Sequence, residues 1–309
     1  MAMSLNYNLV TVLGPTASGK TAFAAMLASQ IKGEVISADS RQIYRRMNLG
    51  TGKDYSDYRV SGLQVPSHLI DIVEPGYKYS VFEYQRDFYK VFRDIQSRKR
   101  FPVLCGGSGM YIDAATRGYR LINVPRNDKL RDELESKSLE EQSSVLSALK
   151  KLHNRTDVDT TEHALRAIEI AVYYRDNPHL MQDTPILNPL YIGILYNRAE
   201  ERARITARLD QRLQQGMVNE VEDLLRSGLS PDSLSYYGLE YRFITAYLMG
   251  RMDYPTMVSL LNNAIHQFAK RQRTWFRKME REGCNIHWLD GNMPLQEKLR
   301  TTLELLQKE

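Results

Sequence analysis

The chain has 309 residues, 42% hydrophobic and 26% charged, which is the composition of an ordinary soluble globular protein. It contains no run of 18 apolar residues and no signal-peptide pattern, so we expect a cytoplasmic protein that does not contact a membrane. Two distant cysteines, Cys105 and Cys284, make neither a disulfide framework nor a metal spacing, and the net charge of +5 gives only a mild bias toward a polyanionic partner.

Strands and helices alternate in the first third of the chain. Apolar and β-branched runs predict strands over 7–13, 34–39, 68–73 and 101–105. Phe23, Leu27 and Ile31 recur every four residues, as in a helix packed on a sheet, and a second helix is predicted over 82–100. This alternation predicts an α/β protein whose parallel sheet is flanked by helices on both faces.

The pattern changes near Gly118. Residues 127–174 are almost entirely helical in character, and a proline-rich segment over 177–189 ends that stretch. A strand over 190–196, a long helix over 199–227, a helix over 255–282 and a short strand over 285–289 follow. We therefore predict an all-helical domain, 119–188, inserted into a core formed by 1–118 and 189–309.

The segment after the first strand matches the pattern G-x-x-x-x-G-K-[ST] of a phosphate-binding loop. Backbone N–H groups of such a loop converge on phosphate oxygens at a helix N-terminus, a lysine adds a full charge, and the final hydroxyl can hold Mg²⁺. A strand before it and a helix after it favour a true loop of the P-loop NTPase-like fold over a chance match. The predicted phosphate-binding residues are Gly14, Pro15, Thr16, Ala17, Ser18, Gly19, Lys20 and Thr21, with Thr21 as the metal ligand.

A nucleoside triphosphatase usually has an acid at the end of a second apolar strand. The strand over 101–105 ends in Gly106-Gly107-Ser108 without a carboxylate, whereas Asp39 ends a different strand. Ligands of parallel sheets bind at the carboxyl ends of the strands, so Asp39 is a candidate for chemistry on a second substrate. A turn or helix-capping role for Asp39, and a plain strand-to-helix turn at Ser108, are the alternatives.

Two basic segments follow. Arg204, Arg208 and Arg212 share one helix face, and Arg208 has no acidic partner along that helix, so it either pairs with a distant carboxylate or faces a bound anion. The segment 262–278 holds five basic residues and no acid, with aromatic residues between them. This pattern is typical of RNA binding, although a solvated surface helix whose Trp275 packs on the core would give the same pattern.

Taken together, these segments make the chain resemble the tRNA dimethylallyltransferase (isopentenyltransferase) family. The matching text is GPTASGKT, ISADSRQIYRRMNLGTGK, GGSGMYI, LRAIEI, YYGLEYR and KRQRTWFRK, in the family's order and over nearly the whole chain. The resemblance implies transfer of a dimethylallyl group from dimethylallyl pyrophosphate to the exocyclic amine of the adenosine 3′ to the anticodon. The phosphate loop would then hold this donor with Mg²⁺ as cofactor, and the protein would act as a monomer.

The resemblance also assigns roles to residues. Asp39 is implied as the general base, Ser108 as the counterpart of a family threonine near the reacting atoms, and Arg208 as a ligand of the donor pyrophosphate. The helical insertion is implied to grip the anticodon stem-loop. The candidate tRNA contacts are Asp39, Ser40, Arg41, Gln42, Arg131, Arg166, Arg242, Lys270, Arg271, Arg273 and Arg277.

The chain departs from the family at YYGLEYR, where Leu239 and Tyr241 are expected to alter a tRNA-contacting surface. Three other functions are compatible with the same residues. The enzyme could prenylate free AMP, it could be a small-molecule kinase that uses ATP in the same loop, or it could be a non-catalytic RNA-binding module with a relic loop.

Overall fold

The computed structural model describes residues 6–119, 121–150, 158–177 and 184–307. They form two compact units, Met1–Tyr119 with Pro185–Glu309, and Arg120–Thr184. None of the described helices is long and apolar enough to cross a membrane.

The first unit is built on a six-stranded sheet in the order β5-β2-β6-β1-β7-β8, in which every neighbouring pair is parallel. This confirms the predicted parallel sheet. Its strands are β1 (Leu9–Leu13), β2 (Gly33–Ala38), β5 (Ser67–His68), β6 (Phe101–Gly106), β7 (Pro189–Leu195) and β8 (Ile286–Asp290).

One predicted strand is much shorter than expected. Of 68–73, only His68 lies in β5, because Leu69 and Asp71 take positive φ angles of 59° and 54° that an extended strand cannot contain. The small antiparallel pair β3 (Arg59–Val60) and β4 (Leu63–Gln64) carries too few residues to give a periodic pattern, and the sequence did not predict it.

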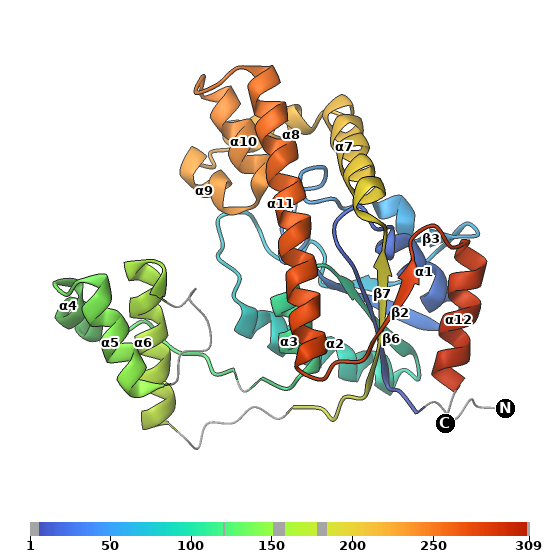
Figure 1. The fold of residues 1–309 in the computed structure, drawn as a ribbon, viewed down its shortest axis with the longest axis horizontal. Coiled ribbons are helices and arrows are strands. Elements are labelled where there is room, and N and C mark those ends of the chain that lie inside the picture. Colours follow the sequence, from blue (N-terminus) through green and yellow to red (C-terminus); the bar gives the residue numbers. More distant parts are fainter. Residues whose placement is uncertain (1–5, 120, 151–157, 178–183, 308–309) are drawn as a thin grey trace. The chain divides into compact units, whose positions relative to one another are not determined.

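Helices cover both faces of the sheet (Figure 1). Alternate strand residues point to opposite faces, so Val10 and Val12 pack with α1 (Lys20–Gln30) and α12 (Leu295–Gln307). Leu9 and Leu13 join the core on the other face. The helices of that core include α2 (Val81–Ser97), α3 (Gly109–Thr116) and α11 (Tyr254–Arg281).

The remaining helices of this unit gather around the N-terminal part of α11 and above β7 (Figure 1). They are α7 (Arg198–Gln214), α8 (Met217–Arg226), α9 (Pro231–Tyr236) and α10 (Leu239–Leu248). The 3₁₀ turn η1 at Tyr55–Tyr58 packs against α1 instead. The single long helix predicted over 199–227 is two helices, because Gly216 adopts a left-handed conformation (φ 96°) and caps α8. The C-terminal helix α12 was not predicted.

The second unit contains α4 (Asp128–Glu135), α5 (Leu139–Leu149) and α6 (Thr161–Asp176). Leu134, Leu146 and Ile168 form the centre of its own small core. Asn127, Ser138 and Thr160 cap the three helices by accepting backbone hydrogen bonds, so each helix begins at a polar residue that satisfies a free N–H group. Parts of the predicted helical and proline-rich stretches, 151–157 and 178–183, lie outside the described residues.

Candidate active site

A cavity of about 880 Å³ opens at the carboxyl edge of the sheet. The strand register aligns Leu13 of β1 and Ala38 of β2 with Gly106 of β6. The loops that follow these three strands therefore converge, and all three line the cavity together with parts of α7 and α11. This is the edge at which parallel α/β sheets bind their ligands.

The phosphate-binding loop forms one wall. Gly19 has a φ of 76°, a conformation that favours glycine, and α1 begins at the next residue, Lys20. The Lys20 ammonium donates a 3.2 Å hydrogen bond to the Pro15 carbonyl, and Arg204 of α7 donates one of 3.0 Å to the Ala17 carbonyl. Burial lowers the pKa of Lys20, and nearby Arg208 lowers it further. A bound anion would offset both effects.

Asp39 and Ser108 lie close together just after the ends of the neighbouring strands β2 and β6. The Asp39 carboxylate accepts a 2.9 Å hydrogen bond from the Arg41 N–H and also lines the cavity, so the turn role and the cavity position coexist. Ser108 Oγ accepts a 3.0 Å hydrogen bond from the Ser40 N–H. The Ser108 hydroxyl therefore holds the turn that carries Asp39.

Gln272 of α11 connects two walls of the cavity, and sequence reasoning missed it. Its side-chain oxygen accepts a 2.9 Å hydrogen bond from the Thr16 N–H, and its amide nitrogen donates one of 2.9 Å to the Gly107 carbonyl. A side chain at Gly107 would place its Cβ 2.4 Å from the Gln272 amide nitrogen, so glycine is needed there for this approach. The buried amide thus holds the phosphate loop and the loop after β6 at a fixed separation.

Arg208 pairs with a distant carboxylate and also lines the cavity, so its ion pair is compatible with contact to a bound anion. It donates a 2.6 Å hydrogen bond to Asp54, and Arg212 donates to the same carboxylate at 3.1 Å. Burial and the charge of Arg208 lower the pKa of Arg212. Desolvation raises the pKa of Glu240, a further carboxyl group on the cavity wall, against the opposing effect of Arg212 and Arg208. Lys20, Arg208 and Arg212 thus bring three basic groups to one cavity.

The rim of the cavity carries aromatic and basic side chains. Tyr236 and Phe268 are 42% and 38% exposed. Arg41 lies over the Tyr236 ring at 5.2 Å, and Arg271 lies near the Phe268 ring at 5.9 Å. Trp275 joins this wall, where its indole N–H donates a 2.8 Å hydrogen bond to Asp113.

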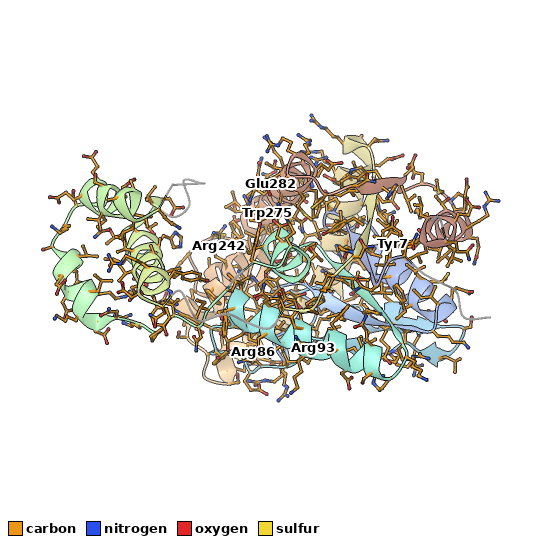
Figure 2. The ribbon with its side chains drawn as sticks, turned by 90° about the horizontal axis from the view of Figure 1, so that it is seen from below. Tyr7, Arg86, Arg93, Arg242, Trp275 and Glu282 are labelled. Atoms are coloured by element: carbon orange, nitrogen blue, oxygen red, sulfur yellow. The ribbon has the colours of Figure 1, made fainter. Side chains whose placement is uncertain are left out.

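Gln42 and Arg242, both predicted tRNA contacts, also line the cavity. The Gln42 amide donates to the Gly52 carbonyl at 3.1 Å and so supports the loop that carries Asp54. Arg242 comes from α10 and Trp275 from α11, and both are marked in Figure 2.

The expected effect of Tyr241 on the surface is wrong. Tyr241 is fully buried, and its hydroxyl donates a 2.7 Å hydrogen bond to Glu220. The same Glu220 carboxylate accepts hydrogen bonds from the backbone N–H groups of Asn48, Leu49 and Gly50. Tyr241 therefore anchors the loop before Asp54 from inside the protein.

Arg131 and Arg166, the two predicted tRNA contacts in the helical unit, are held by internal ion pairs. Arg131 is buried and bonds Glu169 at 2.7 Å and Glu162 at 3.0 Å, so its guanidinium is directed inward and not at a surface phosphate. Arg166 bonds Glu169 at 3.0 Å and the Val124 carbonyl, while 40% of its side chain stays exposed.

The basic segment of α11 is divided between two surfaces. Arg271, Gln272 and Trp275 face the main cavity, whereas Lys270, Arg273 and Arg277 line a second pocket beside α7. Arg273 is not a free surface cation, because only 16% of its side chain is exposed and it pairs with Glu201 of α7 at 3.2 Å. A basic residue with no acidic partner on its own helix can thus form an ion pair with an acidic residue of another helix.

The chain matches two family models, IPP transferase over residues 42–279 and Isopentenyl transferase over residues 7–64. It is 55% identical over 305 residues to a Parabacteroides distasonis protein named tRNA dimethylallyltransferase 1. The aligned region covers 98% of this chain and 99% of that protein. A Porphyromonas gingivalis protein of the same name is 52% identical and covers 96% of this chain and 98% of its own length.

Two solved structures share the fold. The tRNA isopentenylpyrophosphate transferase of Bacillus halodurans has a TM-score of 0.71 at 29% identity, over 97% of this chain and 95% of that one. A eukaryotic dimethylallyltransferase described as acting on tRNA has a TM-score of 0.76 at 20% identity, over 96% and 77% of the two chains. With a family model over most of its length and relatives that share more than half of its residues, the chain belongs to the IPP transferase family.

Proposed function

We propose that the protein is a tRNA dimethylallyltransferase, which transfers the dimethylallyl group of dimethylallyl pyrophosphate to the exocyclic amine of the adenosine 3′ to the anticodon. One observation carries this function within the family. A phosphate-binding loop and the Asp39 carboxylate follow the ends of β1 and β2, on either side of β6, and line one cavity, which can hold a pyrophosphate beside a nucleophile.

The reaction forms one bond and breaks another. The adenine nitrogen attacks the allylic carbon of the donor, the carbon–oxygen bond to pyrophosphate breaks, and its electron pair leaves with the pyrophosphate. Asp39 accepts the proton that the amine loses, in the role of general base. Arg41 holds the Asp39 carboxylate by its backbone N–H, and Ser108 holds the adjoining residue, so the base is oriented before the acceptor arrives.

The departing pyrophosphate is the group whose charge must be stabilised. Lys20, the loop amides from Gly14 to Thr21 and Arg208 would bind its oxygens. Thr21 lies on the cavity wall beside Lys20, and its hydroxyl is a hard oxygen ligand of the kind Mg²⁺ prefers together with phosphate and water oxygens. When bound, Mg²⁺ would neutralise part of the pyrophosphate charge.

The acceptor must be an unstacked base, because the reacting edge of adenine is inside its stack in a helical loop. Tyr236, Phe268 and Trp275 on the cavity rim can stack on such a base, and Arg41, Arg242 and Arg271 can contact the phosphates around it. A tRNA substrate fits a cytoplasmic location, and we propose that the protein acts as a monomer.

Incubation of the purified protein with labelled dimethylallyl pyrophosphate, Mg²⁺ and unmodified tRNA tests this function. We expect label in the tRNA, at the adenosine 3′ to the anticodon, and very little label in free AMP supplied at the same concentration. Efficient prenylation of AMP would make the protein an adenylate isopentenyltransferase. Hydrolysis or transfer from labelled ATP would make it a kinase, and tRNA binding without transfer would make it an RNA-binding module.

A further inference from the structure

A second pocket, of about 310 Å³, lies between α7 and α11. It uses other residues of α7 than Arg204, which contacts the phosphate loop. Two helical stripes form it. Arg198, Glu201, Arg202 and Ile205 follow the i, i+3, i+4, i+7 spacing on α7, and Lys270, Arg273, Thr274 and Arg277 repeat that spacing on α11. The two stripes therefore face one another across the pocket.

The lining of this pocket is strongly basic. Five of its residues are arginine or lysine, and Glu201 is the single acidic residue among the described residues that line it. Glu201 is already neutralised by Arg273 at 3.2 Å. Arg198, Arg202, Lys270 and Arg277 are exposed and form no ion pair with a described residue. Such a concentration of one charge sign in a concave surface attracts an anion.

Three buried polar atoms of the pocket lining have no hydrogen-bond partner among the described residues, namely Arg273 Nε, Glu201 Oε2 and His266 Nδ1. Arg273 Nε is buried and has no hydrogen-bond partner among the described residues, although its Nη1 is held by Glu201. A buried N–H group without a partner costs about 1–3 kcal/mol, so a ligand oxygen or a water that reaches it would stabilise the pocket. The pocket thus offers the Arg273 donor, beside an unpartnered Glu201 oxygen, beneath four exposed cations.

We propose that this pocket binds a phosphate group, with Arg202, Lys270 and Arg277 as its principal ligands. A phosphate is small enough for the pocket and presents several oxygens, so donors from both helices can reach it at once. The phosphate can belong to the RNA backbone, a source that rests on the proposed function, or it can be free inorganic phosphate. Both sources share the same recognition chemistry, and the experiment separates them.

The test uses a double variant with one change on each helix, Arg202→Gln with Arg277→Gln. Its matched control is Arg226→Gln with Arg300→Gln, which removes two exposed arginines from α8 and α12 and changes the net charge equally. A second control, Arg202→Lys with Arg277→Lys, keeps the charge of the pocket. Comparable melting temperatures in chloride buffer establish that the variants are folded.

Binding of tRNA is measured by fluorescence anisotropy at four salt concentrations. We expect the slope of log affinity against log salt to fall by about 0.7–0.9 for each lost phosphate contact in the double variant. The surface control and the lysine variant should keep the wild-type slope. This result assigns the pocket to a backbone phosphate of RNA.

Free phosphate is tested by the melting temperature in inorganic phosphate against chloride at equal ionic strength. The Lys20→Ala background weakens binding at the phosphate loop, and the surface control in the same background accounts for what remains there. A phosphate-specific rise that is lost in the double variant, with an unchanged tRNA slope, assigns the pocket to free phosphate. If neither measurement distinguishes the double variant from the surface control, the proposal is wrong. Neither measurement needs turnover, so the transfer assay on the wild type tests the proposed function separately.

Discussion

Arg208 donates a 2.6 Å hydrogen bond to Asp54, a carboxylate that lies 154 residues earlier in the chain. Arg212, one helical turn further along α7, binds the same carboxylate at 3.1 Å. Two guanidinium groups on one helix face repel each other, and Asp54 holds both in a fixed position beside the phosphate loop. Asp54 is thus a positioning residue for the donor site.

Asp54→Asn should weaken binding of the donor, dimethylallyl pyrophosphate, and not binding of tRNA. The amide keeps the shape of the side chain but loses the charge that orients both arginines, and charge-assisted hydrogen bonds contribute about 1.5–3 kcal/mol each. We expect the KM for dimethylallyl pyrophosphate to rise about ten-fold, with tRNA affinity unchanged. Asp57→Asn is the matched control, since Asp57 lines the same cavity but lies outside the hydrogen-bonded pair. A lower donor KM in Asp54→Asn would mean that Asp54 competes with pyrophosphate.

Asp39→Asn should remove most of the transfer activity and leave tRNA binding nearly intact. An amide cannot take the proton of the acceptor amine, and loss of a general base lowers the rate by about 10²–10⁴-fold. The backbone bond from Arg41 can still form to the amide oxygen, so the turn should keep its shape. Single-turnover rates with saturating donor and tRNA measure the effect. Wild-type turnover in this variant would restrict Asp39 to its turn role.

Changes at Gln272 should show that one buried amide sets the separation of two loops. Gln272→Leu leaves the Thr16 N–H and the Gly107 carbonyl without their partner, at a cost of about 1–3 kcal/mol for each buried group. We expect a lower melting temperature and a higher donor KM. Gln272→Glu keeps the acceptor for Thr16 but loses the donor to Gly107 and adds a negative charge beside the pyrophosphate site, so its donor KM should rise more. Equal kinetic defects in the two variants would contradict this effect of the added charge.

Acid should destabilise the sheet through Glu34, a buried residue of β2. Hydrogen bonding from the Arg98 guanidinium lowers the pKa of Glu34 from 4.5 to about 2, with a further contribution from His68 and against the effect of burial. Since the folded-state pKa lies below the unfolded value, the stabilisation is complete above about pH 4.5 and is lost as the pH falls toward 2. A shift of this size corresponds to about 3 kcal/mol.

Urea unfolding of the wild type and Glu34→Gln at several pH values checks this. The variant should be the less stable protein at pH 6, and the difference should shrink as the pH falls through 4 toward 2. A difference that does not depend on pH would assign the effect of Glu34 to packing alone.

The features that were predicted from the sequence are local. The strand–loop–helix run around Lys20 and the parallel sheet follow from patterns within a few residues, and the structure and the family comparisons confirm the fold. The break at Gly216 was missed because an apolar periodicity continues across it, from α7 into α8.

The parts of the site that were not predicted from the sequence depend on contacts between residues far apart in the chain. Nothing in the neighbourhood of Asp54 or Gln272 indicates that each would reach residues more than 150 positions away. Arg131 and Arg273 look like surface cations in the sequence, and only the folded helices bring Glu169 and Glu201 against them. A sequence shows how charges are spaced along one helix but not what packs across from it.

The order of strands in the sheet has a consequence for synthesis of the protein. β1, which leads into the phosphate loop, lies between β6 and β7, and β7 follows the entire second unit in the chain. A Cβ on Gly14 would lie 2.7 Å from the Ile194 carbonyl, so the loop rests directly on β7. A nascent chain on the ribosome therefore carries the complete loop sequence long before the strand that supports it. A premature stop codon anywhere before β7 should leave no partly active fragment.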